Sequence, residues 1–431
     1  MIGVIIFLVS AYLGGWIVLT KVKETLGLTI WQILGLSWGT GLGILVGIMY
    51  IYSLAHISWN IWLILLPYVS ILLVFVYRNK NVLRMPSFKI PNDSISRVLL
   101  FVLLIAFLTV FLEAISHPVI AWDAIASWYF TAKGFFLSGG IDPSFIQFSH
   151  NSTPPFLHMV IALSYLFAGE IQDTYSLAIY PAFYLSLLCL FYGTIRREAT
   201  QKIALFATVL LATLPDIMRH AGRYDVGNAD LPLSYFFLCT CVFLLICYHS
   251  KSIMPFIFAS CFAVIGAVIK PEGIPFLLVI ELFIFTLLVQ KKKHRYMPLL
   301  LVTLLPFIFW QIYVVYYHLP MNPFLSGGFH IQRLIPVLIA AFLECINIAR
   351  WNLLWIVFFF VLLIGDIKRY WSITVIILFQ LAIYLCIYLF TPLDPISHLH
   401  NSFDRLLLHI APLAMLVITY QTIICMQRRN V

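Results

Sequence analysis

The sequence predicts an all-α integral membrane protein, and three observations support this fold class. Hydrophobic residues make up 62% of the 431 residues and charged residues only 10%, whereas a soluble domain carries about 25% charged residues. Apolar stretches of about 20 residues, the length at which a helix crosses a bilayer, recur along the whole chain. Basic residues gather in short polar segments between these stretches, so the net charge of +9 indicates membrane topology rather than nucleic-acid binding.

The apolar stretches predict about thirteen transmembrane helices. The first stretch has no cationic residue before it, so we interpret it as a retained helix rather than a signal peptide. The expected spans cover residues 2–20, 27–53, 57–77, 98–115, 174–195, 203–216, 231–249, 252–269, 274–290, 297–317, 351–365, 371–391 and 406–425.

The placement of lysine and arginine predicts the orientation of these helices. Nineteen of the 26 basic residues fall on one side of the predicted spans, where the longest polar segment is 78–97. Because basic residues concentrate in cytoplasmic loops, we expect this side to be cytoplasmic. The N-terminus and the segment 117–155 then face outward, and the C-terminus faces the cytoplasm.

Two apolar segments, 154–169 and 331–347, fit this orientation only if they do not span the membrane. We expect each to be a helix that lies at the outer surface or re-enters the membrane there, since amphipathic helices can lie in the interface. The basic segment 78–97 suggests a division of the chain into three leading helices (1–97) and a larger membrane domain (98–431).

Acidic residues point to a polar site on the outer side. Of the 17 acids, 12 fall on that side or at outer helix ends, among the seven remaining cations. Acids hardly influence topology, and ionisable groups near the membrane are costly unless they pair or line a site.

The eight cysteines lack zinc-ligand spacing and fit small buried hydrophobes. The histidines match no strong metal-ligand pattern either.

The outer segment 117–155 holds the first candidate residues. Asp123 opens a predicted helix that ends at Gly139–Gly140. Asp123 is either a plain helix N-cap or a general base that takes a proton from an acceptor hydroxyl. Lys133 and His150, in the same segment, are candidate substrate-binding residues, although the residues around His150 also fit a simple turn before a helix that opens with proline.

Further candidates lie at three other outer helix ends. Asp225 and Asp230 belong to a segment that a salt-bridged hairpin would also explain. Lys270 can bind a lipid phosphate as a point charge or simply extend to the membrane surface. The candidate substrate-binding residues from these three helix ends are Asp225, Asp230, Lys270, Glu272, Asp404 and Arg405, of which Asp404 and Arg405 also fit a plain surface ion pair.

The outer segments resemble a known family. The stretch WDAIASWYFTAKGFF, followed by TPPFLHMVIALSYLFAG, resembles the first outer loop of bacterial GT-C-fold glycosyltransferases. More narrowly, it is similar to relatives of the protein O-mannosyltransferases and of the lipid A aminoarabinose transferase. The resemblance covers roughly 117–415 and includes NADLPLSYFF, KPEGIPFLL and HNSFDRLLLHIAPL. It implies a GT-C-like fold in a bacterial inner membrane, Asp123 as the base, and Lys270 and Arg405 as ligands of a polyprenyl phosphate.

The resulting hypothesis is an integral membrane glycosyltransferase. It would move a sugar from a polyprenyl-phosphate donor to a glycan, lipid or protein acceptor at the outer membrane face. The alternative is a transporter or flippase of a lipid-linked or anionic solute. Transporters tend to show paired repeats with broken helices, which the sequence lacks. The sequence does not assign a cofactor, and a divalent metal remains an open alternative.

Overall fold

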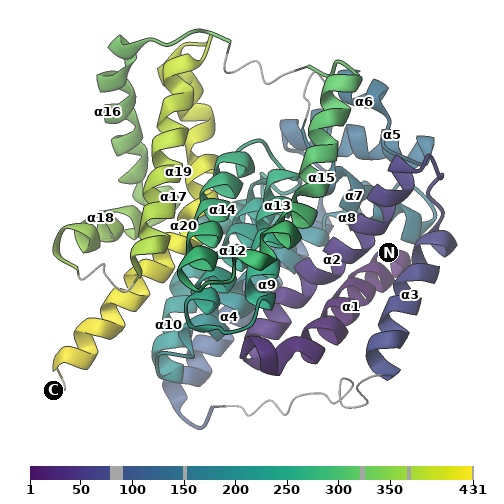
Figure 1. Ribbon diagram of the computed structural model, residues 1–431. Helices are drawn as coiled ribbons and strands as arrows, with labels where there is room; N and C mark the ends of the chain where they lie inside the picture. Colours follow the sequence, from purple (N-terminus) through teal and green to yellow (C-terminus); the bar gives the residue numbers. More distant parts are fainter. Residues whose placement is uncertain (78–90, 149–152, 321–325, 366–369, 430–431) are drawn as a thin grey trace.

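The computed structural model describes residues 1–77, 91–148, 153–320, 326–365 and 370–429. Every regular element within these ranges is a helix (Figure 1). The all-α fold class is therefore confirmed.

Nine helices in the described ranges are long and apolar enough to cross a membrane, or ten if one bent pair counts as a single span. Each of the nine coincides with one of the spans expected from the sequence. They are α1 (Ile2–Leu26), α2 (Ile30–Leu54), α4 (Ser94–Ser116), α9 (Ile179–Ile195, after the short α8, Asp173–Ser176), α12 (Asp230–His249), α14 (Gly273–Gln290), α15 (Met297–Tyr316, after η3, His294–Tyr296), α19 (Trp371–Phe390) and α20 (Pro395–Arg429).

Three of the expected spans are shorter helices. They are α3 (Ile61–Tyr77), α13 (Met254–Ala267) and α18 (Leu354–Ile364), with 17, 14 and 11 residues. The apolar stretch around α13 is longer than its helix because Val268 and Ile269 lie buried in the turn that follows. An apolar run therefore does not give the length of its helix, because it can include a buried turn such as Val268–Ile269.

The expected span at 203–216 is a broken helix. It consists of α10 (Gln201–Ala212) and α11 (Pro215–Gly222), which meet at a bend of 67°. Leu214 has the extended backbone that a residue before proline prefers, and this ends α10. The bend directs the buried side chains of Asp216 and His220 into the protein.

The two non-spanning segments expected at the outer side are both helical. In α7 (Phe156–Ala168), every residue from Phe156 to Tyr165 is buried, and the helix packs among α1, α2 and α5 (Phe130–Ser138). Of the two expectations for 154–169, burial favours a re-entrant helix over one at the surface. The second segment forms η5 (Ile331–Arg333) and α16 (Leu334–Cys345), which packs beside α19 and α20 with one apolar face exposed. A short helix, α17 (Ile348–Trp351), connects it to α18.

Close packing of small residues joins the first two helices. A Cβ atom at Gly15 of α1 would lie 1.9 Å from the Ser37 carbonyl oxygen of α2, and one at Gly41 of α2 would lie 1.8 Å from the Ala11 carbonyl oxygen of α1. Small residues at membrane helix interfaces allow backbones to approach closely. The pair also packs against α7 and α9.

Helix α12 lies at the centre of the fold and positions the polar site. It packs against α9, α13, α14 and α20, and nearly all of its residues are buried. A helix that is apolar on all sides belongs inside a protein or membrane. Its first residue is Asp230, which is completely buried.

The outer segment forms the helix that the sequence predicts. It begins as a π-helix, η2 (Ala124–Tyr129), and continues as α5 until Gly139, whose φ of 69° is left-handed. This confirms the predicted glycine stop. A further short helix, α6 (Pro143–Phe148), follows. π-helical turns are uncommon and frequently occur at functional sites.

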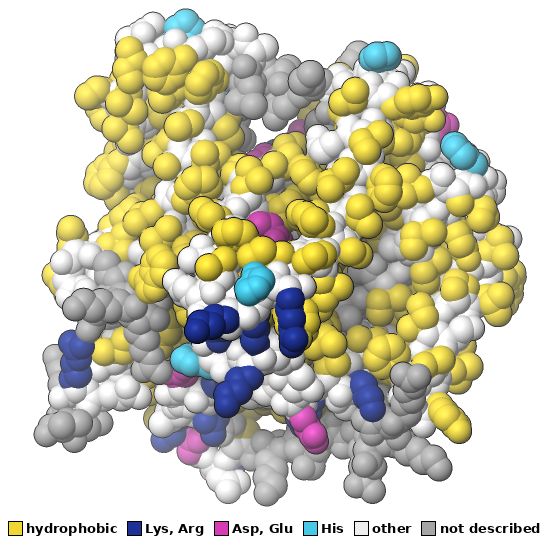
Figure 2. All heavy atoms as spheres, in the orientation of Figure 1, with side chains coloured by type: hydrophobic (Ala, Val, Ile, Leu, Met, Phe, Trp, Pro, Cys, Tyr) yellow, Lys and Arg dark blue, Asp and Glu magenta, His cyan; other side chains and the backbone are white. Residues whose placement is uncertain are grey.

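Lysine and arginine side chains gather at one end of the molecule. Figure 2 shows them over the lower part of the visible face, whereas the faces of the helices above are largely apolar. Helix α12 runs from Asp230 at the end near α5 to His249 near the basic end. We call these two ends the acidic end and the basic end.

Candidate active site

A completely buried carboxylate, Asp230, holds three cationic or hydrogen-bonding side chains. Lys270 Nζ lies 2.7 Å from Asp230 Oδ1, and Arg405 Nε lies 2.9 Å from Asp230 Oδ2. His409 Nε2 lies 2.9 Å from Oδ1. A carboxylate can be buried in this way only when charged partners and hydrogen bonds replace its hydration. We call Asp123, Asp230, Lys270, Arg405 and His409 the Asp230 cluster.

Arg405 connects Asp230 to the proposed base. Its Nη1 is hydrogen-bonded to Asp123 Oδ2, while its Nε binds Asp230. Asp123 makes no side-chain hydrogen bond to the start of η2, so the helix N-cap interpretation is wrong. The Asp123 side chain is 46% exposed, against 19% for Arg405. The more exposed acid therefore faces a cavity, and the guanidinium lies between it and the buried acid.

The turn between α13 and α14 places Lys270 and Glu272. Helix α13 ends at Ala267 and α14 begins at Gly273, and Lys270 Nζ lies 3.4 Å from Glu272 Oε1. Glu272 Oε2 is buried and has no hydrogen-bond partner among the described residues. The turn thus adds one cation and a second, incompletely paired acid to the site.

His409 and Tyr384 extend the cluster into the interior. The Tyr384 hydroxyl lies 3.0 Å from His409 Nδ1. With Asp230 accepting from Nε2–H, Nδ1 is the acceptor of the tyrosine proton. Sequence reasoning did not place His409 in the site. One signal was available, because His409 follows Arg405 by four residues and so shares its helix face.

A cavity of about 700 Å³ opens beside the Asp230 cluster. Asp123, Lys270, Glu272 and Arg405 line its polar part. Trp122, with 78% of its side chain exposed, also lines this cavity. Residues of α14 and α19 form an apolar wall, among them Pro275, Ile383, Ile387 and Phe390. The cavity therefore combines a charged region with an apolar one.

The other aromatic residues of the outer segment have structural contacts. Trp128 is buried and stacks on His158, although it also contributes to the cavity lining. Tyr129 is buried and accepts a hydrogen bond from Ser176 at 3.1 Å. Of Trp122, Trp128 and Tyr129, Trp122 alone is exposed.

A second group of charges, which we call the Arg219 cluster, lies next to the first. Arg219 contacts Asp404 and Asp225 at 2.6 Å each. Arg350 contacts Asp404 at 2.9 Å. Burial raises the pKa of Asp225, although the neighbouring Arg219 opposes this shift. The complete cluster contains Asp216, Arg219, Asp225, Glu344, Arg350 and Asp404.

The two clusters separate the residues that the sequence grouped together. Asp404 is 4% exposed and bonded to Arg219 and Arg350, so the expectation of a plain Asp404–Arg405 surface pair is wrong. Lys133 lies outside both clusters and pairs with Asp173 at 2.6 Å. His150 lies outside the described residues. The charges that line the cavity thus come from three different segments of the chain.

Metal binding was left open by the sequence. Within the described ranges, no three histidine, cysteine, aspartate or glutamate side chains lie together in a way that could hold a metal ion. The acids of the Asp230 cluster contact cationic side chains instead.

One family model matches part of the chain. The family model of dolichyl-phosphate-mannose-protein mannosyltransferases matches residues 152–313, which is less than half of the chain. The match confirms the resemblance to GT-C-fold glycosyltransferases. Together with the membrane-length helices, it supports a membrane glycosyltransferase of the mannosyltransferase type. No curated protein and no solved structure matches the chain. The matched segment includes α12, Asp230 and Lys270 but neither Asp123 nor Arg405.

Proposed function

We propose that this glycosyltransferase moves a sugar from a polyprenyl-phosphate donor to a hydroxyl acceptor in the cavity beside the Asp230 cluster. The observation that carries the proposal is the position of Arg405, which binds the buried Asp230 and the cavity-facing Asp123 at the same time. The acidic end would face outward, in agreement with the concentration of basic residues at the opposite end.

Lys270 and Arg405 would bind the donor phosphate. Both line the cavity and both are anchored by Asp230. Arginine and lysine form strong charge-assisted hydrogen bonds to phosphate oxygens. An incoming phosphate competes with Asp123 for Arg405, and this releases the Asp123 carboxylate toward the acceptor.

The chemistry then needs one base and stabilisation of one leaving group. The acceptor oxygen attacks the anomeric carbon of the sugar, and the bond from that carbon to the phosphate oxygen breaks. The phosphate leaves with the bonding electrons, and its charge is stabilised by Lys270 and Arg405. Asp123 takes the proton of the acceptor hydroxyl.

The buried acid would position the cations rather than react. Asp230 is 0% exposed, and Lys270, Arg405 and His409 occupy its two oxygens. It therefore has no access to an acceptor hydroxyl. Glu272, which lines the cavity and has a free buried oxygen among the described residues, is the better alternative base.

The apolar wall supports a lipid-linked donor. Ile383, Ile387 and Phe390 of α19 line the same cavity as Lys270 and Arg405. A phosphate bound by these cations would place the adjoining polyprenyl chain against this wall, where it stays out of water. A soluble nucleotide sugar would gain nothing from such a surface.

Release of polyprenyl phosphate tests this function without knowledge of which molecule is the acceptor. Purified protein in detergent is mixed with polyprenyl-phosphate mannose and an extract of cell-envelope glycans and lipids, and the lipid products are measured by mass spectrometry. We expect free polyprenyl phosphate to accumulate with wild-type protein and not with Arg405→Ala. Equal release by the wild type and Arg405→Ala would contradict the proposal. Absence of release by the wild type with polyprenyl-phosphate mannose and with other lipid-linked sugars would also contradict it.

A further inference from the structure

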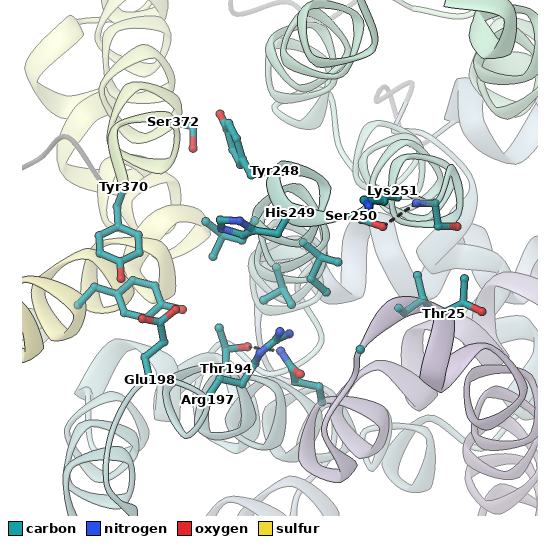
Figure 3. Close-up of a pocket in the computed structure, with 18 of the residues that line it drawn as sticks. Thr25, Thr194, Arg197, Glu198, Tyr248, His249, Ser250, Lys251, Tyr370 and Ser372 are labelled. Atoms are coloured by element: carbon teal, nitrogen blue, oxygen red, sulfur yellow. Dashed lines mark hydrogen bonds between the residues drawn. The ribbon is translucent and has the colours of Figure 1, made fainter. Parts of the chain in front are cut away.

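A second cavity of about 680 Å³ lies at the basic end of the molecule. It is formed where α1, α9 and α12 end and where α2 and α19 begin. Figure 3 shows Glu198 and Tyr370 on one side of it and Thr25 and Lys251 on the other, with His249 between them. The glycosyl-transfer reaction proposed above uses none of these residues.

This cavity is remote from the Asp230 cluster. Helix α12 connects them, because Asp230 is its first residue and His249 its last. Its 20 residues correspond to a length of about 30 Å, since an α-helix rises about 1.5 Å per residue. The two cavities are therefore separated by about the thickness of a bilayer core.

Two cations of the cavity have no partner among the residues that the structure describes. Arg197 and Lys251 both line it, and neither side chain makes an ion pair or hydrogen bond with any residue that the structure describes. Tyr248 also lines the cavity, and its hydroxyl faces Ser372, another lining residue. Basic residues at helix C-termini are common, but that explanation does not account for the cavity that these two cations line.

The lining has apolar and polar parts. Leu245, Ile246 and Trp371 lie among its apolar residues, and the Trp371 side chain is 48% exposed. Exposed tryptophan at a helix end is typical of the membrane–water interface. A molecule in this cavity would thus contact charged groups at one end and apolar groups at the other.

We propose that this cavity binds the phosphodiester headgroup of a membrane lipid. Arg197 and Lys251 would bind the phosphate oxygens, and the Tyr248 hydroxyl would donate a further hydrogen bond. Glu24 and Glu198 also line the cavity, so its acids balance its two permanent cations. The two acids repel a singly charged diester less than free phosphate, which carries about −1.5 to −2 charges at neutral pH.

Native mass spectrometry with short-chain phosphatidylglycerol tests the proposal on the full chain in detergent. The double variant Arg197→Gln/Lys251→Gln should bind the lipid about tenfold more weakly or worse, since charge-assisted hydrogen bonds are lost. Tyr248→Phe, which removes one hydroxyl, should weaken binding by about two- to tenfold. The control Lys23→Gln/Lys292→Gln removes two cations from the same end, but neither lines the cavity, and it should bind as wild type does.

Inorganic phosphate serves as the competing probe. We expect millimolar phosphate to leave lipid binding unchanged. Displacement of the lipid by phosphate at that concentration would assign the cavity to a free anion and overturn the proposal. Equal loss of lipid in the control and cavity double variants would overturn it too, because the effect would then be general surface charge.

Discussion

Arg405 Nε of α20 lies 2.9 Å from Asp230 Oδ2 of α12, although the two residues are 175 positions apart in the chain. One side of this guanidinium is therefore bound to an acid that is completely buried. The other side reaches Asp123 at the cavity. Asp230 therefore fixes the position of the Arg405 guanidinium, and Arg405 in turn fixes the position of the Asp123 carboxylate.

Loss of Asp230 should destabilise the protein strongly. Asp230→Ala leaves Lys270 and Arg405 without their buried counter-ion, and breaking a buried ion pair in this way costs about 3–5 kcal/mol. Thermal unfolding in detergent measures the loss. Lys133→Ala breaks the partly exposed pair with Asp173 and should cost no more than about 1 kcal/mol. Similar losses in the two variants would show that Asp230 does not anchor the site.

The donor site depends on the two cations at the cavity. Lys270→Ala and Arg405→Ala should each weaken binding of polyprenyl-phosphate sugar by on the order of 1.5–3 kcal/mol, the value of a charge-assisted hydrogen bond. Arg223→Ala removes a cation at the same end that pairs with Glu113 and does not line the cavity, so its affinity should stay unchanged. Wild-type affinity in both Lys270→Ala and Arg405→Ala would exclude this role.

The acidic end should face outward. In a background without the exposed Cys386 and Cys425, a membrane-impermeant thiol reagent added to intact cells should modify Ser138→Cys. It should not modify Lys292→Cys, which is exposed at the basic end. The reverse labelling pattern would place the cavity in the cytoplasm and remove the proposed access to outer acceptors.

The contact between α1 and α2 should tolerate no side chain at Gly41. A Cβ there lies 1.8 Å from the Ala11 carbonyl oxygen, so Gly41→Ala should destabilise the protein by about 1–3 kcal/mol through overpacking. Gly47 is on the same helix, and its Cβ would meet nothing within 4 Å. Gly47→Ala should therefore stabilise by up to about 1 kcal/mol, the helix propensity difference. Equal thermal unfolding of the two variants would contradict the close packing.

Hydropathy predicted the long helices well but not where polar residues turn inward. Within the described ranges, the nine membrane-length helices each matched an expected span because their apolar runs are uninterrupted. The bend before Pro215 converted one expected span into two helices and buried Asp216 and His220. Burial of such residues depends on partners from distant segments, which a linear pattern does not contain.

The candidate site was predicted only in part, because its residues come from distant segments of the chain. Asp123, Lys270 and Arg405 stood out as charges at outer helix ends, and the structure brings all three to one cavity. Lys133 was grouped with them because it shares the outer segment, yet it faces Asp173 instead. His409 was missed as part of the site because its bond to Asp230 joins α20 to α12, a pairing that only the folded arrangement creates.

Sugar transfer by Asp123→Asn tests the central claim most directly. This change keeps the shape of the side chain but removes its ability to accept the acceptor proton. With purified protein and a polyprenyl-phosphate sugar, we expect normal thermal unfolding and donor binding at least as tight as in the wild type, because the carboxylate that competes for Arg405 is gone. Transfer should nevertheless fall by about 10²–10⁴-fold, the usual contribution of a general base. Transfer at nearly the wild-type rate would contradict the account and move the role of base to Glu272.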